Sequence, residues 1–95
     1  MDLEFTDEAI DDLEYIHHFL IEAEVVNHQE IIEEVISGAE NIRVFPRSGV
    51  QVPKAESPDL LRDYYYKNFV LRYLITASRI FILRVWHQKE NERNK

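Results

Sequence analysis

The sequence contains no cysteine, two glycines, three prolines and a single tryptophan. Without cysteine, disulfides and thiolate metal sites are excluded, and a reducing cytoplasm is the expected location. No apolar stretch approaches the roughly 20 residues of a membrane-spanning helix, and no basic segment followed by an apolar run opens the chain. We therefore expect one domain over residues 1–95 with no membrane contact and no secretory signal, ending in a polar, mobile tail over 88–95.

Basic residues are scarce in the first half of the chain. The formal net charge is −7, but residues 1–45 carry 13 acidic side chains and one basic one, whereas residues 46–95 carry 5 acidic and 10 basic ones. The first half repels polyanions, and the second half could attract an acidic partner. Direct binding to nucleic acid is therefore not expected.

A short strand and an amphipathic helix are predicted for the first 23 residues. Polar and apolar residues alternate over 2–5, which is typical of a strand. Thr6 stands where an N-cap is expected, and acidic residues follow it in the first turn of the helix. Apolar residues then recur at helical spacing up to Ala23, while the acidic side chains, Asp12 among them, fall largely off that stripe.

A second helix is predicted after a short connection. Asn27 with Glu30 three positions later matches a capping box, and apolar residues over 31–42 trace one face. Gly38 costs about 1 kcal/mol against alanine within a helix, so we expect it to mark a close crossing of the two helices. Pro46 ends this helix.

The C-terminal half predicts an antiparallel meander after a loop over residues 45–58. Three apolar segments are separated by turns of two residues, and the last is the most apolar run in the chain; they span 60–66, 69–76 and 79–87. The resulting β-α-α-β-β-β order predicts a two-layer α+β domain, with a helical hairpin on one face of an antiparallel sheet. The other face of the sheet is then left for a partner.

Four segments resemble a known family when taken together. The junction Phe45-Pro-Arg-Ser-Gly-Val-Gln-Val-Pro53 is similar to an "FPxxGxxVP" motif, Leu61-Arg62-Asp63 to an "lRe" motif and Leu83-Arg84-Val85-Trp86-His87 to an "lRVxH" motif. The opening from Thr6 to Ile16 fits the same pattern. Over residues 2–88 the chain thus resembles the ParE-like toxins of the RelE/ParE superfamily. The resemblance implies the fold predicted above and the toxin half of a type II toxin–antitoxin (plasmid stabilisation) module, bound by a cognate antitoxin in a hetero-oligomer.

The superfamily has two branches with different targets. RelE-like members cut mRNA on the ribosome. Their sequences share two arginines, one directly after an aromatic residue on the penultimate strand and one after the last strand. Here Val70 follows Phe69, and Gln88 follows His87. Both mismatches and the acidic first half favour the ParE-like reading, which implies inhibition of DNA gyrase with no cofactor. A ribosome-dependent mRNA endonuclease using His87, Arg84 and Arg72 is the alternative, and a non-toxic partner-binding module of the same fold is a third.

The expected binding surface combines cationic and aromatic side chains of the last three strands. We expect these residues to meet the antitoxin or the target: Arg62, Tyr64, Tyr66, Arg72, Arg84, Trp86 and His87. The antitoxin is expected to add a strand or an amphipathic helix with acidic residues. The alternative for Arg84 is a structural ion pair with Asp63 or Glu56, because an unpaired charge within an apolar strand is costly.

Two further questions depend on geometry. A two-residue turn at Ala77-Ser78 would pair Arg72 with Leu83 and place Arg72 and Arg84 on opposite faces, whereas a three-residue loop would pair the two arginines. His17, His18 and His28 lie on acidic helices, and adjacent His17 and His18 point in different directions, so no metal site is expected. His87 is expected to be structural or partner-binding, because no nucleophile or orienting carboxylate occurs at a recognisable spacing.

Overall fold

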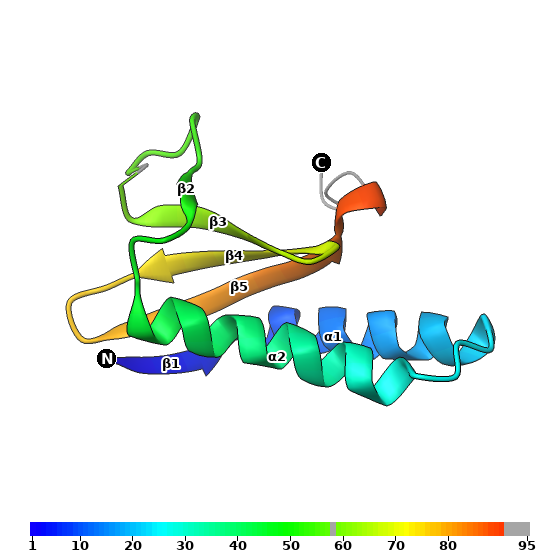
Figure 1. The fold of residues 1–95 in the computed structure, drawn as a ribbon. Helices are drawn as coiled ribbons and strands as arrows, with labels where there is room; N and C mark the ends of the chain where they lie inside the picture. Colours follow the sequence, from blue (N-terminus) through cyan, green and yellow to red (C-terminus); the bar gives the residue numbers. More distant parts are fainter. Residues whose placement is uncertain (58, 91–95) are drawn as a thin grey trace.

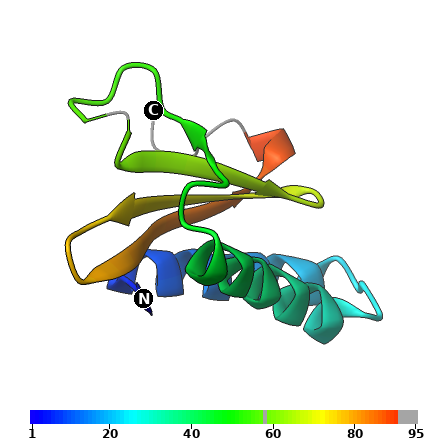
Figure 2. The ribbon, with the colours of Figure 1, turned by 60° about the vertical axis from the view of Figure 1, so that its left-hand side comes forward.

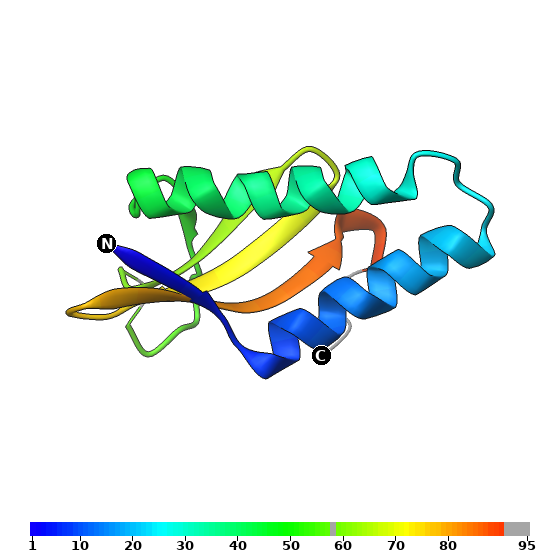
Figure 3. The ribbon, with the colours of Figure 1, turned by 90° about the horizontal axis from the view of Figure 1, so that it is seen from below.

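The helical layer begins at the predicted cap. In the computed structural model, which describes residues 1–57 and 59–90, the backbone N–H of Ala9 donates to Thr6 Oγ1 at 3.2 Å, and helix α1 (Asp7–Glu22) follows. Helix α2 (His28–Val44) returns antiparallel to it. The predicted capping box does not form, because the Asn27 side chain makes no capping hydrogen bond. The two helices converge on the connection over residues 23–27, and that end of the hairpin extends beyond the sheet (Figures 1 and 3).

The second layer is a mixed sheet of five strands in the order β1-β5-β4-β3-β2. The predicted meander is confirmed, with antiparallel pairing of β3 to β4 and of β4 to β5. The sheet is not wholly antiparallel, since β1 pairs in parallel with β5, and a two-residue strand, β2, pairs with β3 within the predicted loop. The strands are β1 (Asp2–Phe5), β2 (Val50–Gln51), β3 (Leu61–Tyr66), β4 (Phe69–Ile75) and β5 (Arg79–His87).

The core lies between the helices and one face of the sheet. Both helices lie on the same side of the strands in two views (Figures 1 and 2), so the predicted two-layer α+β arrangement is confirmed. Alternate residues of β4 and β5 point toward the helices, and Leu71, Tyr73, Ile80 and Ile82 are fully buried there. Apolar burial against one helical layer accounts for this periodicity of two along the strands.

The pairing of β4 with β5 contains an irregularity that the turn alone does not predict. The turn at Ala77-Ser78 is short, and Thr76 N–H donates to the Arg79 carbonyl at 2.9 Å. The register then shifts between Arg72 and Tyr73, so Tyr73 lies opposite Ile82 while Arg72 lies opposite Arg84. One extra residue in β5 therefore brings the two arginines opposite each other without a longer loop.

Gly38 faces a strand rather than the other helix. A Cβ at this position would lie 3.1 Å from Cγ and Cδ2 of Tyr66. The expected close helix crossing is therefore wrong, and the glycine makes room for a tyrosine ring at the end of β3. The ring of Tyr66 in turn stacks with that of Tyr64, with centroids 6.1 Å apart.

No described helix is both long and apolar enough to span a lipid bilayer. Beyond β5, the predicted polar tail starts with one turn of 3-10 helix, Gln88–Glu90. The rest of that predicted tail, residues 91–95, lies outside the described residues.

Candidate functional site

Arg84 is paired with a buried carboxylate of the first helix. Its Nε and Nη2 donate to the two Asp12 oxygens at 2.8 and 2.9 Å, in a bidentate pair. Asp12 is 1% exposed and also accepts the backbone N–H of Val85 at 2.8 Å. The hydrogen bond that it donates to Asp12 raises the pKa of the Arg84 guanidinium above its ordinary value. The prediction that Arg84 would pair with Asp63 or Glu56 is therefore wrong.

This contact lets α1 protect the edge of β5 where β1 ends. The N–H of Thr6 donates to the Ile82 carbonyl at 3.0 Å, and Thr6 Oγ1 lies 3.2 Å from the Leu83 carbonyl. Asp12 then takes the N–H of Val85, two residues further along. Thr6 and the Asp12 side chain thus satisfy backbone groups that would otherwise leave an open strand edge.

Arg72 lies on the sheet face away from the helices, with its charge also paired. Its Nε and Nη2 donate to Asp63 at 2.8 and 2.9 Å, and its guanidinium lies 5.2 Å from the centre of the Trp86 ring. Trp86 and Val70 are register partners and are 8% and 2% exposed. Arg72, Asp63 and Trp86 therefore form a largely covered polar–aromatic cluster.

Arg62 joins the start of β3 to the loop that follows α2, and its side chain is buried, with the residue 8% exposed. It donates to the carbonyls of Asp59 and Gly49 at 2.9 and 2.8 Å, to that of Arg47 at 3.1 Å, and to the Asp59 carboxylate. Beside it, Tyr73 Oη accepts the Gly49 N–H at 2.9 Å and donates to the Pro46 carbonyl at 2.6 Å. These bonds fix the segment after α2, and Arg62, which was expected to meet the antitoxin or the target, presents little exposed surface.

Tyr64 and Tyr66 also lie on the helix side of the sheet. Both are partly buried against the core, and Tyr64 Oη accepts a hydrogen bond from Asn41 of α2 at 3.3 Å. Tyr65 points the other way and is 56% exposed. The expected single surface is therefore split: the side chains of Arg62, Tyr64, Tyr66 and His87 lie toward the helices, and those of Arg72 and Trp86 lie on the face away from the helices.

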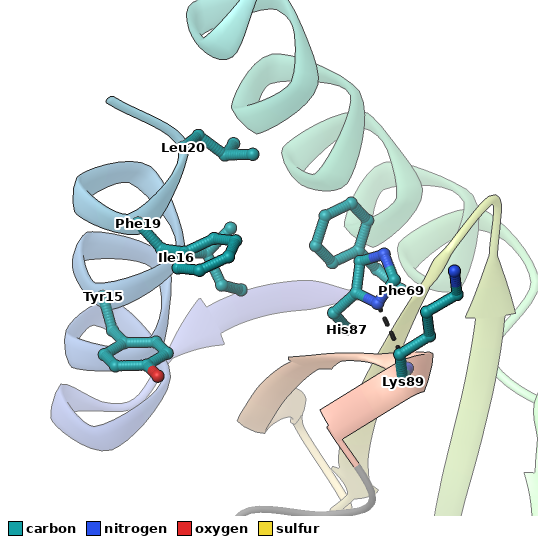
Figure 4. Close-up of a pocket in the computed structure, with 7 residues that line it drawn as sticks. All are labelled: Tyr15, Ile16, Phe19, Leu20, Phe69, His87 and Lys89. Carbon is teal, nitrogen blue, oxygen red and sulfur yellow. Dashed lines mark hydrogen bonds between the residues drawn. The ribbon is translucent and has the colours of Figure 1, made fainter. Parts of the chain in front are cut away.

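His87 borders an apolar cavity of about 310 Å³ between α1 and the end of the sheet (Figure 4). The cavity is lined by Tyr15, Ile16, Phe19, Leu20, Phe69, His87 and Lys89. The His87 ring meets Phe69 edge-on, with centroids 5.2 Å apart, and its Nδ1 accepts the Lys89 N–H at 3.1 Å. The neutral ring is therefore held with its proton on Nε2.

Two exposed aromatic residues of α1 extend the cavity outward. Tyr15 and Phe19, four residues apart on the same helix face, are 51% and 60% exposed. A second cavity of about 170 Å³ shares Leu20, Phe69 and His87 with the first. We call the residues that line the two cavities the hairpin groove; exposed apolar surface of this kind is typical of a protein-binding site.

The sequence-based prediction missed Asp12 and the aromatic pair of the groove. The placement of Asp12 off the apolar stripe is wrong, because it lies three residues after Ala9 and four before Ile16 and is buried with them; this spacing was the available signal. Tyr15 and Phe19 have the i, i+4 spacing but fall beside the stripe, where they resemble ordinary surface residues. Within residues 1–57 and 59–90, no group of three or more His, Cys, Asp or Glu is placed to hold a metal ion.

Comparisons with known proteins agree with this fold. The solved structure described as "Chromosomal ParDE TA system from P. aeruginosa" superposes with a TM-score of 0.72 and 19% identity, covering 92% of this chain and 95% of that one. A search of the curated proteins finds no match. The family described as "ParE toxin of type II toxin-antitoxin system, parDE" matches residues 3–92. The chain therefore belongs to the ParE toxin family of type II toxin–antitoxin systems.

Proposed function

We propose that this protein inhibits growth by blocking DNA gyrase in the cytoplasm and that a cognate antitoxin neutralises it by direct binding. Membership of the ParE family supports the toxin role and implies an antitoxin partner. The choice of gyrase over the ribosome depends mainly on one observation. The three residues that a nuclease would use, Arg72, Arg84 and His87, do not form a common site.

A metal-free RNase needs a base, an acid and a cation that converge on one phosphate. Arg84 donates to Asp12, and Arg72 donates to Asp63, so each guanidinium is occupied by a carboxylate of the chain itself. His87 lies on the helix side of the sheet against Phe69, whereas Arg72 lies on the opposite side with Trp86. This separation supports a toxin that acts by binding rather than by cutting RNA.

The hairpin groove is the proposed docking place for the antitoxin. It combines an apolar cavity, exposed Phe19 and Tyr15, and a cationic rim at Lys89. An amphipathic helix that inserts apolar side chains and carries acidic residues beside Lys89 and His87 would match this surface. In this proposal Tyr66 lines the groove and Trp86 and Arg72 form a secondary contact, while Arg62, Tyr64 and Arg84 act by holding the surface in shape.

Two assays with the purified full chain test the target. With gyrase, relaxed plasmid and ATP, we expect loss of supercoiling and accumulation of gyrase–DNA cleavage complexes. In a translation extract, we expect ribosome-bound mRNA to stay intact. Cleavage within ribosome-bound codons, with gyrase unaffected, would instead establish the RelE-like endonuclease. Induced expression that leaves growth and both assays unchanged would favour the non-toxic binding module.

A further inference from the structure

We propose that His17 and His28 form a two-ligand site for a divalent transition-metal ion, with Cu²⁺ and Ni²⁺ preferred. The two histidines lie on different helices, five residues before the end of α1 and at the first residue of α2. His17 Nε2 and His28 Nδ1 face each other at 2.9 Å, with ring centroids 4.9 Å apart and planes tilted by 39°. The structure thus joins two histidines that the sequence places on separate elements.

The distance between the two nitrogens matches a chelating pair. Imidazole nitrogens bind such ions at about 2.0–2.1 Å, so two ligands at a right angle are separated by about 2.9 Å and two at a tetrahedral angle by about 3.3 Å. The observed 2.9 Å is the length of a hydrogen bond between the two rings, and it equals the spacing of neighbouring corners of a square-planar or octahedral ion. Nitrogen and oxygen ligands in those geometries are typical of Cu²⁺ and Ni²⁺.

Binding of an ion would replace the hydrogen bond between the two rings. Without an ion, one ring donates its N–H and the other accepts it, so the two nitrogens share one proton. When an ion binds, that proton moves to the second nitrogen of the donor ring, which leaves both facing nitrogens available as ligands. Because no third His, Cys, Asp or Glu joins them within the described part of the chain, water would fill the remaining positions.

The backbone between the helices holds the two rings in place. The connection over residues 23–27 is ordered by hydrogen bonds from the N–H groups of Ala23, Glu24 and Val25 to the carbonyls of Phe19, Ile21 and Leu20, at 2.9 to 3.0 Å. Both rings are half-buried. The surrounding half of the chain is strongly acidic, which raises the local concentration of cations. A bound ion would therefore tie α1 to α2 beside the hairpin groove.

The test is a titration of the tag-free full chain with CuCl₂ and NiCl₂ by isothermal calorimetry, with MgCl₂ as a hard-cation control. We expect one Cu²⁺ or Ni²⁺ per chain and no Mg²⁺ binding. His17→Gln and His28→Gln should each weaken binding about tenfold or more, because a single imidazole remains. His18→Gln is the matched control, since His18 is exposed and pairs with Glu22 at 3.2 Å, and it should bind as the wild type does.

Electron paramagnetic resonance of the Cu²⁺-loaded wild-type chain gives a second readout that needs no variant. Coupling to two imidazole nitrogens is expected. A spectrum with one nitrogen ligand, unchanged binding in His17→Gln or His28→Gln, or an equal loss in His18→Gln would overturn the proposal. Far-ultraviolet circular dichroism shows whether each variant is folded. If a variant is not folded, the electron paramagnetic resonance spectrum of the wild-type chain decides the question.

Discussion

At the scale of single residues, Asp12 is the side chain that most changes the interpretation of the sequence. An acid at a core-facing position of a helix is costly to bury unless its charge is matched. Here Asp12 meets a bidentate arginine and a strand N–H. Arg84, which the sequence suggested as a contact for a partner, is thereby a link between the first helix and the last strand.

Replacing Asp12 should therefore destabilise the fold. We expect Asp12→Ala to lower the free energy of unfolding by about 2–4 kcal/mol, because it leaves Arg84 unpaired and the Val85 N–H unsatisfied. Asp11→Ala, one residue earlier and exposed, should change it by less than about 0.5 kcal/mol. Urea unfolding measures both, and equal values would contradict a structural role for Asp12. In an Arg84→Ala background the Asp12→Ala cost should shrink, since the two effects share one interaction.

Tyr73 predicts how stability responds to alkaline pH. Burial raises the pKa of its phenol above the ordinary value of 10.0, although the hydrogen bond from the Gly49 N–H opposes this. A raised pKa means that the folded state keeps its proton while the unfolded state loses it. The contribution of Tyr73 to the free energy of unfolding is therefore complete below about pH 10, and it is lost as pH rises through the folded-state pKa.

Stability curves of the wild type and Tyr73→Phe between pH 8 and 11 test this expectation. The free energy of unfolding of the wild type should fall more steeply with pH above about 10 than that of the variant. The variant is expected to be less stable at pH 8, because the hydroxyl that joins Pro46 and Gly49 is gone. Parallel slopes in the two proteins would contradict the shifted pKa.

At the scale of elements, local patterns in the sequence predicted more than contacts between elements. The cap at Thr6 and the strand from Arg79 to His87 have the predicted positions, because helical spacing and an uninterrupted apolar run are local signals. The parallel pairing of β1 with β5 joins segments more than 70 residues apart. The register shift beside Arg72 depends on how β4 pairs with β5, about 10 residues further along the chain. Nothing in the alternation of a single strand encodes either feature.

The same limit applies to the site. The sequence indicated the cations and aromatics of the last three strands, but a shifted register and alternating faces decide which of them share a surface. Arg62 was misplaced because its four carbonyl and carboxylate acceptors come from the loop before it. The cavity beside His87 was missed because it forms only where α1 passes the end of β5.

Gly38 offers a test of the contact between α2 and β3. Alanine is favoured over glycine within a helix by about 1 kcal/mol, but its Cβ would press on the Tyr66 ring at 3.1 Å. We expect Gly38→Ala not to stabilise the wild type, and to stabilise a Tyr66→Ala variant by about 1 kcal/mol. A double-mutant cycle from chemical unfolding measures the coupling. A similar gain in the free energy of unfolding in both backgrounds would show that the Tyr66 ring can move to make room for the added Cβ.

At the scale of the whole molecule, the helices cover one side of the sheet and leave their own outer surface partly apolar. The exposed aromatics, the cavity and Lys89 lie together where α1 passes the end of β5 (Figure 4). At the opposite end of α2, Met1, Val44, Phe45 and Ile75 line another, more open hollow. Two separate apolar surfaces would allow the antitoxin and the target to bind at different places.

The proposed antitoxin site predicts that a charge within the groove blocks neutralisation without unfolding the toxin. Phe19→Asp should weaken antitoxin binding at least about tenfold, because Phe19 is 60% exposed and an inserted apolar side chain would meet a carboxylate. Ile36→Asp is the control, since Ile36 is 47% exposed on α2 and lines neither cavity of the groove. Calorimetric titration with the antitoxin measures both. Equal losses, or none in Phe19→Asp, would remove the groove from the interface.

The parallel pairing of β1 with β5 also sets an order of events during synthesis. Asp2 lies beside Arg79 and Phe5 beside Ile82, so β1 cannot pair with its neighbour until β5 has been synthesised. The Asp12 carboxylate likewise waits for Arg84 and Val85. The sheet and its link to α1 are therefore completed only after β5 has been made, late in the folding of this domain. A chain interrupted before β5 would leave β1 without its neighbour and the Asp12 carboxylate without its arginine.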